Sequence, residues 1–254
     1  MSKEKKNVDL IYGIHAVKML LQTRSADVVT LLVQSGRHDQ RINEIIQLAD
    51  SFNVKHEELP KAKLQELAGD TAAHQGIIAK CRPLTAWTEK ELMDFVENTE
   101  DRVLLLILDG VQDPHNLGAC LRSANAFGVN AVIVPKDRAA SITDVVRKVS
   151  CGAAEQTPCV AVTNLNRTLE HLKEANIWLM GFDSDAPLAL TDVDLKGNMG
   201  IVMGGEGEGL RRLTRETCDY LAKIPMLGAV ESLNVSVATG VVLYEVQRQR
   251  NVAL

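Results

Sequence analysis

Apolar positions in the first third of the chain recur at two spacings, one typical of helices and the other of strands. Ile14, Val17, Leu20 and Leu21 fall on one helical face, and short apolar runs between such segments indicate strands. Helices are predicted at residues 14–21, 41–52 and 61–68, and strands at residues 28–33, 54–56 and 77–81. Together they make a small α/β domain, residues 1–82, close to the minimum size for an independent core.

A proline and an acidic stretch follow this domain. Pro83 ends the last strand pattern, and residues 88–97 have the periodicity of one short helix. Residues 83–101 are therefore expected to form a linker.

The remainder of the chain, residues 102–254, alternates strand and helix signals. It opens on a continuous apolar run, residues 103–108, as expected for a strand that is covered on both faces. Further strands are predicted at residues 131–134, 159–162, 177–182, 201–203 and 221–225, and helices at residues 117–127, 144–149, 168–175, 210–218 and 233–250. Such alternation predicts an α/β domain with a mostly parallel sheet, whose ligands bind beyond the carboxyl ends of the strands.

Composition adds limits to this picture. The 254 residues are 46% hydrophobic and 24% charged, and no apolar run approaches the ~20 residues that are needed to span a bilayer. The first residues are charged and no signal-peptide stretch follows them, so we expect a cytoplasmic protein. Five dispersed cysteines and six scattered histidines predict neither a disulfide framework nor a metal site.

The net charge of −5 is unusual for a protein that binds nucleic acid. Residues 1–82 hold 12 basic and 10 acidic residues, a net of +2, and the rest hold 16 and 23, a net of −7. Any contact with RNA must therefore come from local basic patches. Candidate phosphate contacts are Lys3, Lys5, Lys6, Arg37, Arg41, Lys61, Lys63, Lys80 and Arg82.

Three segments, each placed just after a predicted strand, carry the candidate chemistry. The first, residues 108–124, puts Asn116 where a helix is expected to begin and Arg122 nearly two turns later, away from the apolar face. By position alone, Asn116 is an N-cap and Arg122 is a solvated helix residue.

The second segment, residues 202–210, has four glycines within six positions, which lets a backbone approach a ligand closely. It fits neither the dinucleotide fingerprint nor a P-loop. The third segment, residues 224–238, brings Ser232 and Asn234 to the start of the last helix, where they can cap the helix or face a ligand.

In their order, spacing and residue identities, the three segments resemble the signature motifs of the SpoU/TrmH (SPOUT-class) RNA ribose 2′-O-methyltransferases. The resemblance covers essentially the whole second part, and residues 11–17 and 74–77 resemble the ribosomal-protein-like substrate-binding domain of that family. It implies a C-terminal domain with a deep trefoil knot, S-adenosyl-L-methionine as the methyl donor, and a homodimer. The two-domain form is most similar to members that methylate a guanosine of 23S rRNA, free or in a pre-ribosomal particle, with members that act on tRNA as the near alternative.

The resemblance also implies residue roles. Arg122 would be catalytic by clamping a substrate phosphate and aligning the ribose hydroxyl, since a guanidinium is a poor base. Asn116 would hold Arg122 or the ribose, and the floor of the pocket would be completed by Glu206, Ser232 and Asn234. The implied cofactor contacts are Gly204, Gly205, Ile224, Met226, Leu233 and Asn234.

Other functions fit parts of the sequence. RNA base methyltransferases can use a cysteine nucleophile in a Pro-Cys pair such as Pro158-Cys159, although a buried structural thiol is the simpler interpretation. A non-catalytic RNA-binding or ribosome-assembly protein could retain the fold, but all three motifs are intact here. The missing dinucleotide fingerprint disfavours a nicotinamide-binding protein.

Overall fold

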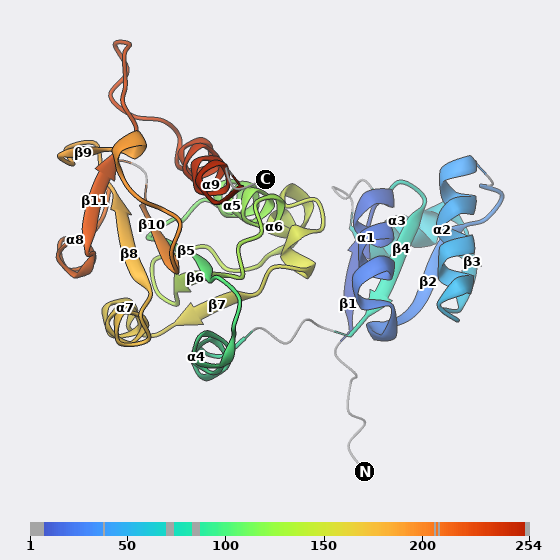
Figure 1. Ribbon diagram of the computed structural model, residues 1–254. Helices are drawn as coiled ribbons and strands as arrows, with labels where there is room; N and C mark the ends of the chain where they lie inside the picture. The colour runs from blue at the N-terminus through green and yellow to red at the C-terminus, as the bar shows by residue number, and fades with distance from the viewer. Residues whose placement is uncertain are drawn as a thin grey trace. The chain divides into compact units, whose positions relative to one another are not determined.

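The computed structural model describes residues 8–37, 39–69, 74–82, 87–205, 207 and 209–251. The chain divides into two compact units, Met1–Thr85 and Ala86–Leu254, each with its own sheet and its own core (Figure 1). The two folded parts that the sequence predicts are therefore present.

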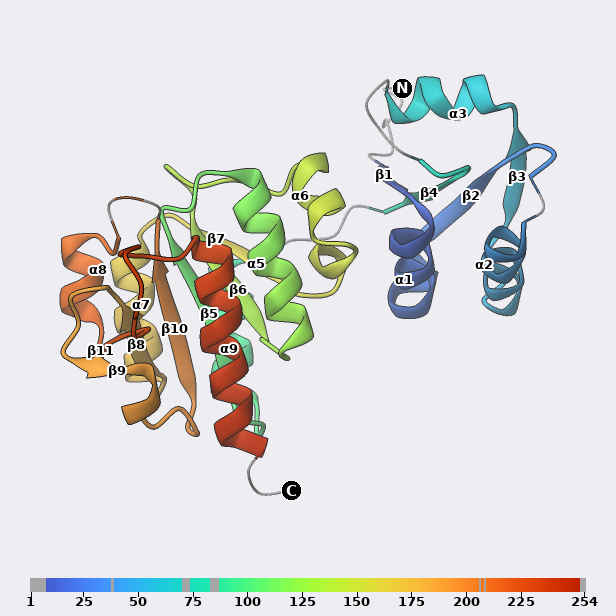
Figure 2. The ribbon, with the colours of Figure 1, turned by 90° about the horizontal axis from the view of Figure 1, so that it is seen from above.

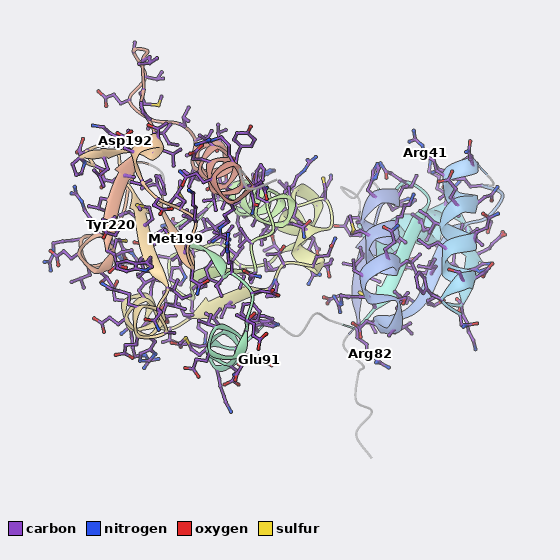
Figure 3. All side chains as sticks on the ribbon, viewed as in Figure 1. Arg41, Arg82, Glu91, Asp192, Met199 and Tyr220 are labelled. Carbon is purple, nitrogen blue, oxygen red and sulfur yellow. The ribbon has the colours of Figure 1, made fainter. Side chains whose placement is uncertain are left out.

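The N-terminal unit is built on a four-stranded sheet in the order β1-β4-β2-β3. Its strands are β1 (Asp9–Tyr12), β2 (Val28–Gln34), β3 (His56–Leu59) and β4 (Ile77–Cys81), and its helices are α1 (Ile14–Arg24), η1 (Ser25–Asp27), α2 (Gln40–Ser51) and α3 (Lys61–Ala68). Because β4 is antiparallel to β1 and β2 while β3 is parallel to β2, the strands β1, β2 and β3 all end where β4 begins. Figure 3 labels Arg41, at the start of α2, and Arg82, just after β4, at opposite ends of this unit.

Helices cover both faces of this small sheet (Figure 2). On one face, Leu31 and Val33 of β2 share a core with Ile42 and Ile45 of α2, and on the other face Leu32 packs with Leu64 and Ile78. The predicted helices and the strands predicted at residues 28–33 and 77–81 are confirmed. The strand predicted at residues 54–56 is found instead at His56–Leu59, so the two ranges share only His56. The sequence did not predict β1, because only one of its four side chains is buried and no alternation results.

The C-terminal unit contains a seven-stranded sheet in the order β7-β6-β5-β10-β8-β11-β9, and every pair of neighbours is parallel. Its strands are β5 (Leu104–Asp109), β6 (Ala131–Pro135), β7 (Cys159–Val162), β8 (Trp178–Phe182), β9 (Leu188–Ala189), β10 (Met199–Gly204) and β11 (Tyr220–Lys223). From β5 the chain adds β6 and β7 on one side, and it later inserts β10 on the other side. The boundary between β5 and β10 is therefore a topological switch point, where open parallel sheets bind ligands.

Two layers of helices cover this sheet (Figure 1). The helices are α4 (Glu89–Asn98), α5 (Pro114–Ala126), α6 (Asp144–Val149), η2 (Ala153–Glu155), α7 (Leu165–Glu174), η3 (Leu190–Asp192), α8 (Arg212–Thr217) and α9 (Val235–Asn251). Helices α5 and α9 lie on one side of the sheet, and α4 and α7 lie on the other. Successive side chains of β5 point to opposite faces. Leu104, Leu106 and Leu108 join the core under α5 and α9, whereas Leu105 and Ile107 join the core under α4 and α7. The prediction of a mostly parallel α/β domain is confirmed.

Helix α4 lies within the stretch that we expected to be a linker. It begins at a capping box, in which the Thr88 hydroxyl accepts from the Glu91 N–H at 3.2 Å and the Glu91 carboxylate accepts from the Thr88 N–H at 2.7 Å. Leu92 and Val96 are buried in the core of the C-terminal unit. This part of residues 83–101 therefore packs as a helix of the C-terminal unit, while Pro83 lies outside the described residues.

The implied knot depends on how two late segments cross the sheet. The loop after β10 packs against the loop after β5, since a Cβ on Gly205 would lie 2.6 Å from the carbonyl oxygen of Gly110. The chain then returns from β11 to place α9 against α5. The trefoil knot itself stays a prediction.

Candidate active site

The first motif segment forms the loop after β5 and the start of α5. The helix begins at Pro114 and is capped by Asp113, whose carboxylate accepts from the His115 N–H at 2.8 Å. The prediction that the helix starts near Asn116, with Asn116 as its N-cap, is therefore wrong by almost one turn. Asn116 is instead a buried residue of the first turn, and Arg122 is exposed on the same helix, as expected.

Asn116 connects the first segment to the third. Its Oδ1 accepts a hydrogen bond from Asn234 Nδ2 at 3.0 Å, across 118 positions of sequence. Asn234 also caps α9, because its Oδ1 accepts from the Ser236 N–H at 2.9 Å. The capping and the site-forming interpretations of Asn234 are thus compatible, since one amide serves both purposes.

The glycine-rich second segment is folded back on itself at the end of β10. A Cβ on Gly204 would lie 2.1 Å from the carbonyl carbon of Gly209, so a side chain at 204 would not fit there. The Gly205 N–H donates to the carbonyl of Asp109 at 2.9 Å, which joins this loop to the end of β5. Gly207 and Gly209 have positive φ and open space where a Cβ would be. Glu206, predicted to lie in the pocket floor, falls outside the described residues.

An ion pair between a buried carboxylate and a partly exposed guanidinium at this edge was not predicted from the sequence. Asp109, the last residue of β5, is 1% exposed and forms an ion pair with Arg211, which follows the glycine loop. The carboxylate also accepts from the Arg211 backbone N–H at 3.1 Å and from its Nε at 2.5 Å. Such a pair holds the two sides of the switch point together. A charged residue at the end of an otherwise apolar strand was the available signal.

The third segment emerges from β11, two strands away from β10. Met203, Phe182 and Ala222 lie in one row across β10, β8 and β11. The glycine loop and the residues after Lys223 therefore leave the sheet about 10 Å apart at the same edge. Of the residues predicted here, Ile224, Met226 and Leu233 are half-buried, whereas Ser232 and Asn234 are exposed.

Cys159, the possible nucleophile of a base methyltransferase, is poorly placed for that reaction. Cys159 is buried at the first position of β7, and burial raises its thiol pKa to about 12. Because the thiolate is the reactive form, a thiol that stays protonated at neutral pH is a poor nucleophile. The structure thus favours a structural role for Cys159. Within the described part of the chain, no three His, Cys, Asp or Glu side chains gather to hold a metal ion, and no helix is long and apolar enough to cross a bilayer.

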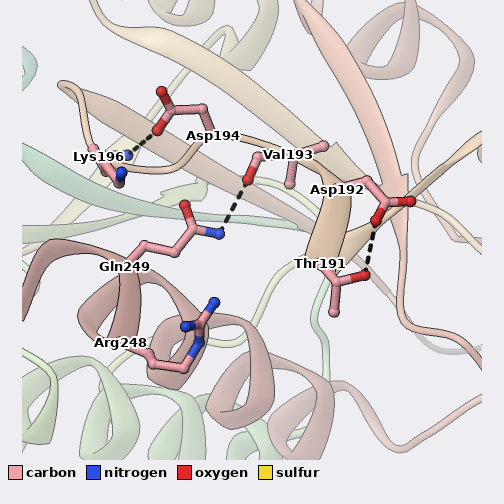
Figure 4. A pocket seen from close by; sticks show the side chains of 7 residues that line it. All are labelled: Thr191, Asp192, Val193, Asp194, Lys196, Arg248 and Gln249. Carbon is pink, nitrogen blue, oxygen red and sulfur yellow. Dashed lines mark hydrogen bonds between the residues drawn. The ribbon is translucent and has the colours of Figure 1, made fainter. Parts of the chain in front are cut away.

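A hollow of about 420 Å³ lies elsewhere, between η3 and the last turns of α9 (Figure 4). Its polar groups are bonded to each other: Gln249 Nε2 donates to the Val193 carbonyl at 3.0 Å, and the Lys196 N–H donates to Asp194 Oδ1 at 3.0 Å. None of the predicted site residues lines this hollow. The strand-end edge therefore remains the candidate site.

Comparison with known families decides how this edge is classified. The SpoU rRNA methylase family matches residues 103–244, which include all three motif segments. The chain belongs to this family. Residues 10–87 match a second family, described as the substrate-binding domain of RNA 2′-O ribose methyltransferases. Membership makes the chain an RNA methyltransferase of the type that uses S-adenosylmethionine.

Similar proteins span nearly the full length of the chain. A protein from Coxiella burnetii named 23S rRNA (guanosine-2′-O-)-methyltransferase RlmB is 53% identical over 240 residues, covering 94% of this chain and 95% of its own. The protein of the same name from Pseudomonas aeruginosa is 51% identical, covering 94% and 96%. Among solved structures, the SpoU methyltransferase AviRb from Streptomyces viridochromogenes in complex with AdoMet is 25% identical, with a TM-score of 0.77 and coverage of 99% and 95%.

Proposed function

We propose that the protein transfers a methyl group from S-adenosyl-L-methionine to the ribose 2′-hydroxyl of a specific guanosine in 23S rRNA. The observation that carries this proposal is the meeting of the three motif segments at one edge of the parallel sheet, beside the switch point. Relatives named for this reaction support it, because they match both units of the chain.

Arg122 is the proposed catalytic residue. It clamps the phosphate beside the target ribose and aligns the 2′-hydroxyl for attack, which is how a permanently protonated guanidinium can accelerate the transfer. Its exposure on α5 lets it reach an RNA backbone. Asn116 and Asn234 hold the starts of α5 and α9 together, and Ser232 and Glu206 are assigned to the floor of the pocket.

The methyl donor is proposed to bind between the second and third segments. When bound, S-adenosylmethionine supplies a methyl group on a positively charged sulfur. Apart from their chain neighbours, no side chain or backbone atom of the described residues lies within 4 Å of the Cβ positions of Gly207 and Gly209, so their backbone is accessible to a ligand, and Gly204 and Gly205 would offer backbone contacts. The half-buried side chains that would contact the adenine are Ile224, Met226 and Leu233, with Asn234 as the polar neighbour.

We infer that the working form is a homodimer. Val237, Val241 and Tyr244 repeat along α9 at helical spacing, yet they are 51%, 39% and 60% exposed. A second copy of the chain would cover this apolar stripe through a two-fold contact. The stripe lies on the helix that packs beside α5, since Ser123 faces Gly240. Sedimentation of the protein and of Tyr244→Lys tests it, because only the variant should dissociate.

The proposed reaction takes place in the cytoplasm, on 23S rRNA or a pre-ribosomal particle. Mapping of 2′-O-methyl sites in total RNA, from cells with and without this gene, tests it. We expect one guanosine of 23S rRNA to become sensitive to alkaline cleavage in cells that lack the gene, because ribose methylation blocks cleavage at the next phosphodiester. A lost site in tRNA would assign the chain to the sister activity, and an unchanged map would refute the proposal.

A further inference from the structure

The part of α5 that carries Arg122 is supported by the chain segment that runs from α6 to β7. Four residues before Arg122, Gly118 lies so close to α6 that a Cβ there would be 2.7 Å from Val149 Cβ. Three residues after Arg122, Asn125 Nδ2 donates to the Thr157 hydroxyl at 3.2 Å. Because residues three and four apart lie on one side of a helix, both contacts support the side of α5 on which Arg122 lies.

This segment, residues 147–157, is closed on itself by an ion pair, and we call it the brace. Glu155 is 3% exposed and pairs with Arg147, whose side chain is 21% exposed. The hydroxyl of buried Ser150 donates to the Arg147 carbonyl at 3.0 Å and accepts from the Ala154 N–H at 3.3 Å. The two ends of the brace are therefore fixed to each other as well as to α5.

An ion pair with a buried carboxylate is a costly way to hold such a segment, because both charges lose water. Apolar side chains of similar volume commonly give equal or greater stability. The pair adds a fixed direction, since a carboxylate and a guanidinium bond in only a few geometries. A fixed direction matters most where the supported helix aligns a reacting group, because a displacement of about 1 Å there can lower the rate about 100-fold.

We propose that Glu155 and Arg147 are positioning residues of the methyl transfer, which act by holding Arg122 in place on α5. The contact at Val149 sets the distance between α5 and α6, and the hydrogen bond at Thr157 opposes rotation of α5 about its axis. The ion pair keeps these two points of contact at a constant separation. The inference rests on the proposed function in one respect, that Arg122 takes part in the transfer.

The test compares Glu155→Gln with Glu89→Gln in single-turnover transfer of labelled methyl. Glu89 is the matched control, because its carboxylate also joins two helices of this unit, accepting from Thr168 Oγ1 at 2.8 Å, but in the layer away from α5. Glu155→Gln should lower the rate at saturating RNA about tenfold or more, while the KM for RNA and the affinity for S-adenosylhomocysteine stay within about twofold of the parent. Glu89→Gln should keep the parental rate.

A second measurement shows whether the effect acts through Arg122. In the Arg122→Ala background, Glu155→Gln should lower the rate by less than about twofold, because the group that the brace positions is already absent. An equal loss in both backgrounds would overturn the inference. So would equal losses in Glu155→Gln and Glu89→Gln, or a parental rate in Glu155→Gln.

Thr157→Val keeps the brace testable if Glu155→Gln fails to fold. It removes only the acceptor of the hydrogen bond from Asn125 and nearly preserves the volume of the side chain. The same pattern should appear with a loss of about threefold in the parent and none in Arg122→Ala. A parental rate in Thr157→Val would overturn the inference in that case.

Hydrogen exchange measures the brace without reference to activity. The α5 amides next to Arg122 should exchange faster in Glu155→Gln than in the parent and in Glu89→Gln. If the parent transfers no methyl group to 23S rRNA, the proposed function fails, and exchange in α5 still decides whether the brace holds this helix. If the parent methylates and exchange in α5 is the same in all three proteins, only this inference fails.

Discussion

The two units present polar groups at the edge of a sheet in opposite ways. In the N-terminal unit, Arg37 and Lys61 stay accessible beside glycine turns. In the C-terminal unit, Asp109 and Asn116 are buried and bound to partners 102 and 118 positions away. A surface that binds a flexible polyanion works by charge and access, whereas a site that aligns reacting atoms needs its parts fixed to each other.

This difference predicts different consequences of mutation. Substitutions of Arg37 and Lys61 should change RNA affinity and leave stability nearly intact. Substitutions among the bonded groups of the C-terminal unit should change stability or turnover, because each group there holds another chain segment in place.

The largest expected effect comes from Arg122. If its loss weakened RNA binding without slowing methyl transfer, the contrast between the two units would be wrong. Arg122→Ala should lower methyl transfer at saturating RNA by at least about 100-fold, since one positioned charged donor commonly supplies that much. Because Arg122 is exposed, stability and S-adenosylhomocysteine affinity should change little. Single-turnover transfer of labelled methyl and calorimetry measure the two quantities.

Arg167→Ala is the matched control for that variant. Arg167 is an exposed arginine of α7, on the helical layer away from α5, and it should retain parental turnover. Near-normal turnover in Arg122→Ala would remove Arg122 from the mechanism, and weaker RNA binding without slower transfer would make it an affinity contact.

The next effect tests whether the switch point depends on its ion pair. Arg211→Ala leaves the Asp109 carboxylate buried, and it should lower the free energy of unfolding by about 2 to 3 kcal/mol, a value reduced for the partial exposure of Arg211. Affinity for S-adenosylhomocysteine should fall as well, because the glycine loop loses its anchor. Urea unfolding and calorimetry measure both.

Arg212→Ala provides the neighbouring comparison. Arg212 is 77% exposed and pairs with Glu216 on the surface, so its loss should cost less than about 1 kcal/mol. If both variants lost the same stability, the pair between Asp109 and Arg211 would be an ordinary surface contact.

Sequence patterns predicted the elements better than the contacts between them. Strand β5 was predictable because the six consecutive apolar residues 103–108 signal a strand covered on both faces. The sequence also contains a signal for the start of α5, because Asp113 is a favourable N-cap and Pro114 a favourable first helical residue. Asn116 is a favourable N-cap as well, which is why the helix was predicted to begin three residues too late. The capping box of α4 predicts that a helix begins there, but it does not predict that Leu92 packs in the core of the C-terminal unit.

The contacts that build the candidate site were beyond such patterns. Arg211 was one of several charged residues after the glycine loop, and only the insertion of β10 beside β5 brings it to Asp109. The bond between Asn116 and Asn234 likewise depends on α9 returning to α5. Local periodicity cannot specify pairings that the order of strands in the sheet decides.

A smaller effect isolates that second pairing. Asn116→Ala and Asn234→Ala, alone and combined, should give a coupling energy of about 1 kcal/mol in urea unfolding, the usual contribution of one hydrogen bond. Asn234→Ser separates the two roles of Asn234, because serine still caps α9 but is too short to reach Asn116. Asn234→Ser should therefore be nearly as stable to capping loss as the parent, unlike Asn234→Ala, but it should show no coupling energy with Asn116→Ala. If Asn234→Ser kept the full coupling energy, the hydrogen bond between Asn116 and Asn234 would not be what joins the two helices.

The smallest effect should appear only in the N-terminal unit, as a dependence on pH. Burial, then the charges of Lys61 and Arg37, lowers the pKa of His74 below its ordinary 6.5, so the unfolded chain takes up this proton at a higher pH than the folded chain. The free energy of unfolding should therefore rise with pH through the window from the folded pKa up to 6.5, and the contribution of neutral His74 is complete above it. His74→Gln, whose amide oxygen can replace Nδ1 of His74 as the acceptor from the Gly76 N–H, should flatten this dependence in thermal unfolding while the transition of the C-terminal unit stays as in the parent. An identical pH profile in parent and variant would mean that His74 takes up its proton without loss of stability and that the two cations do not act on it.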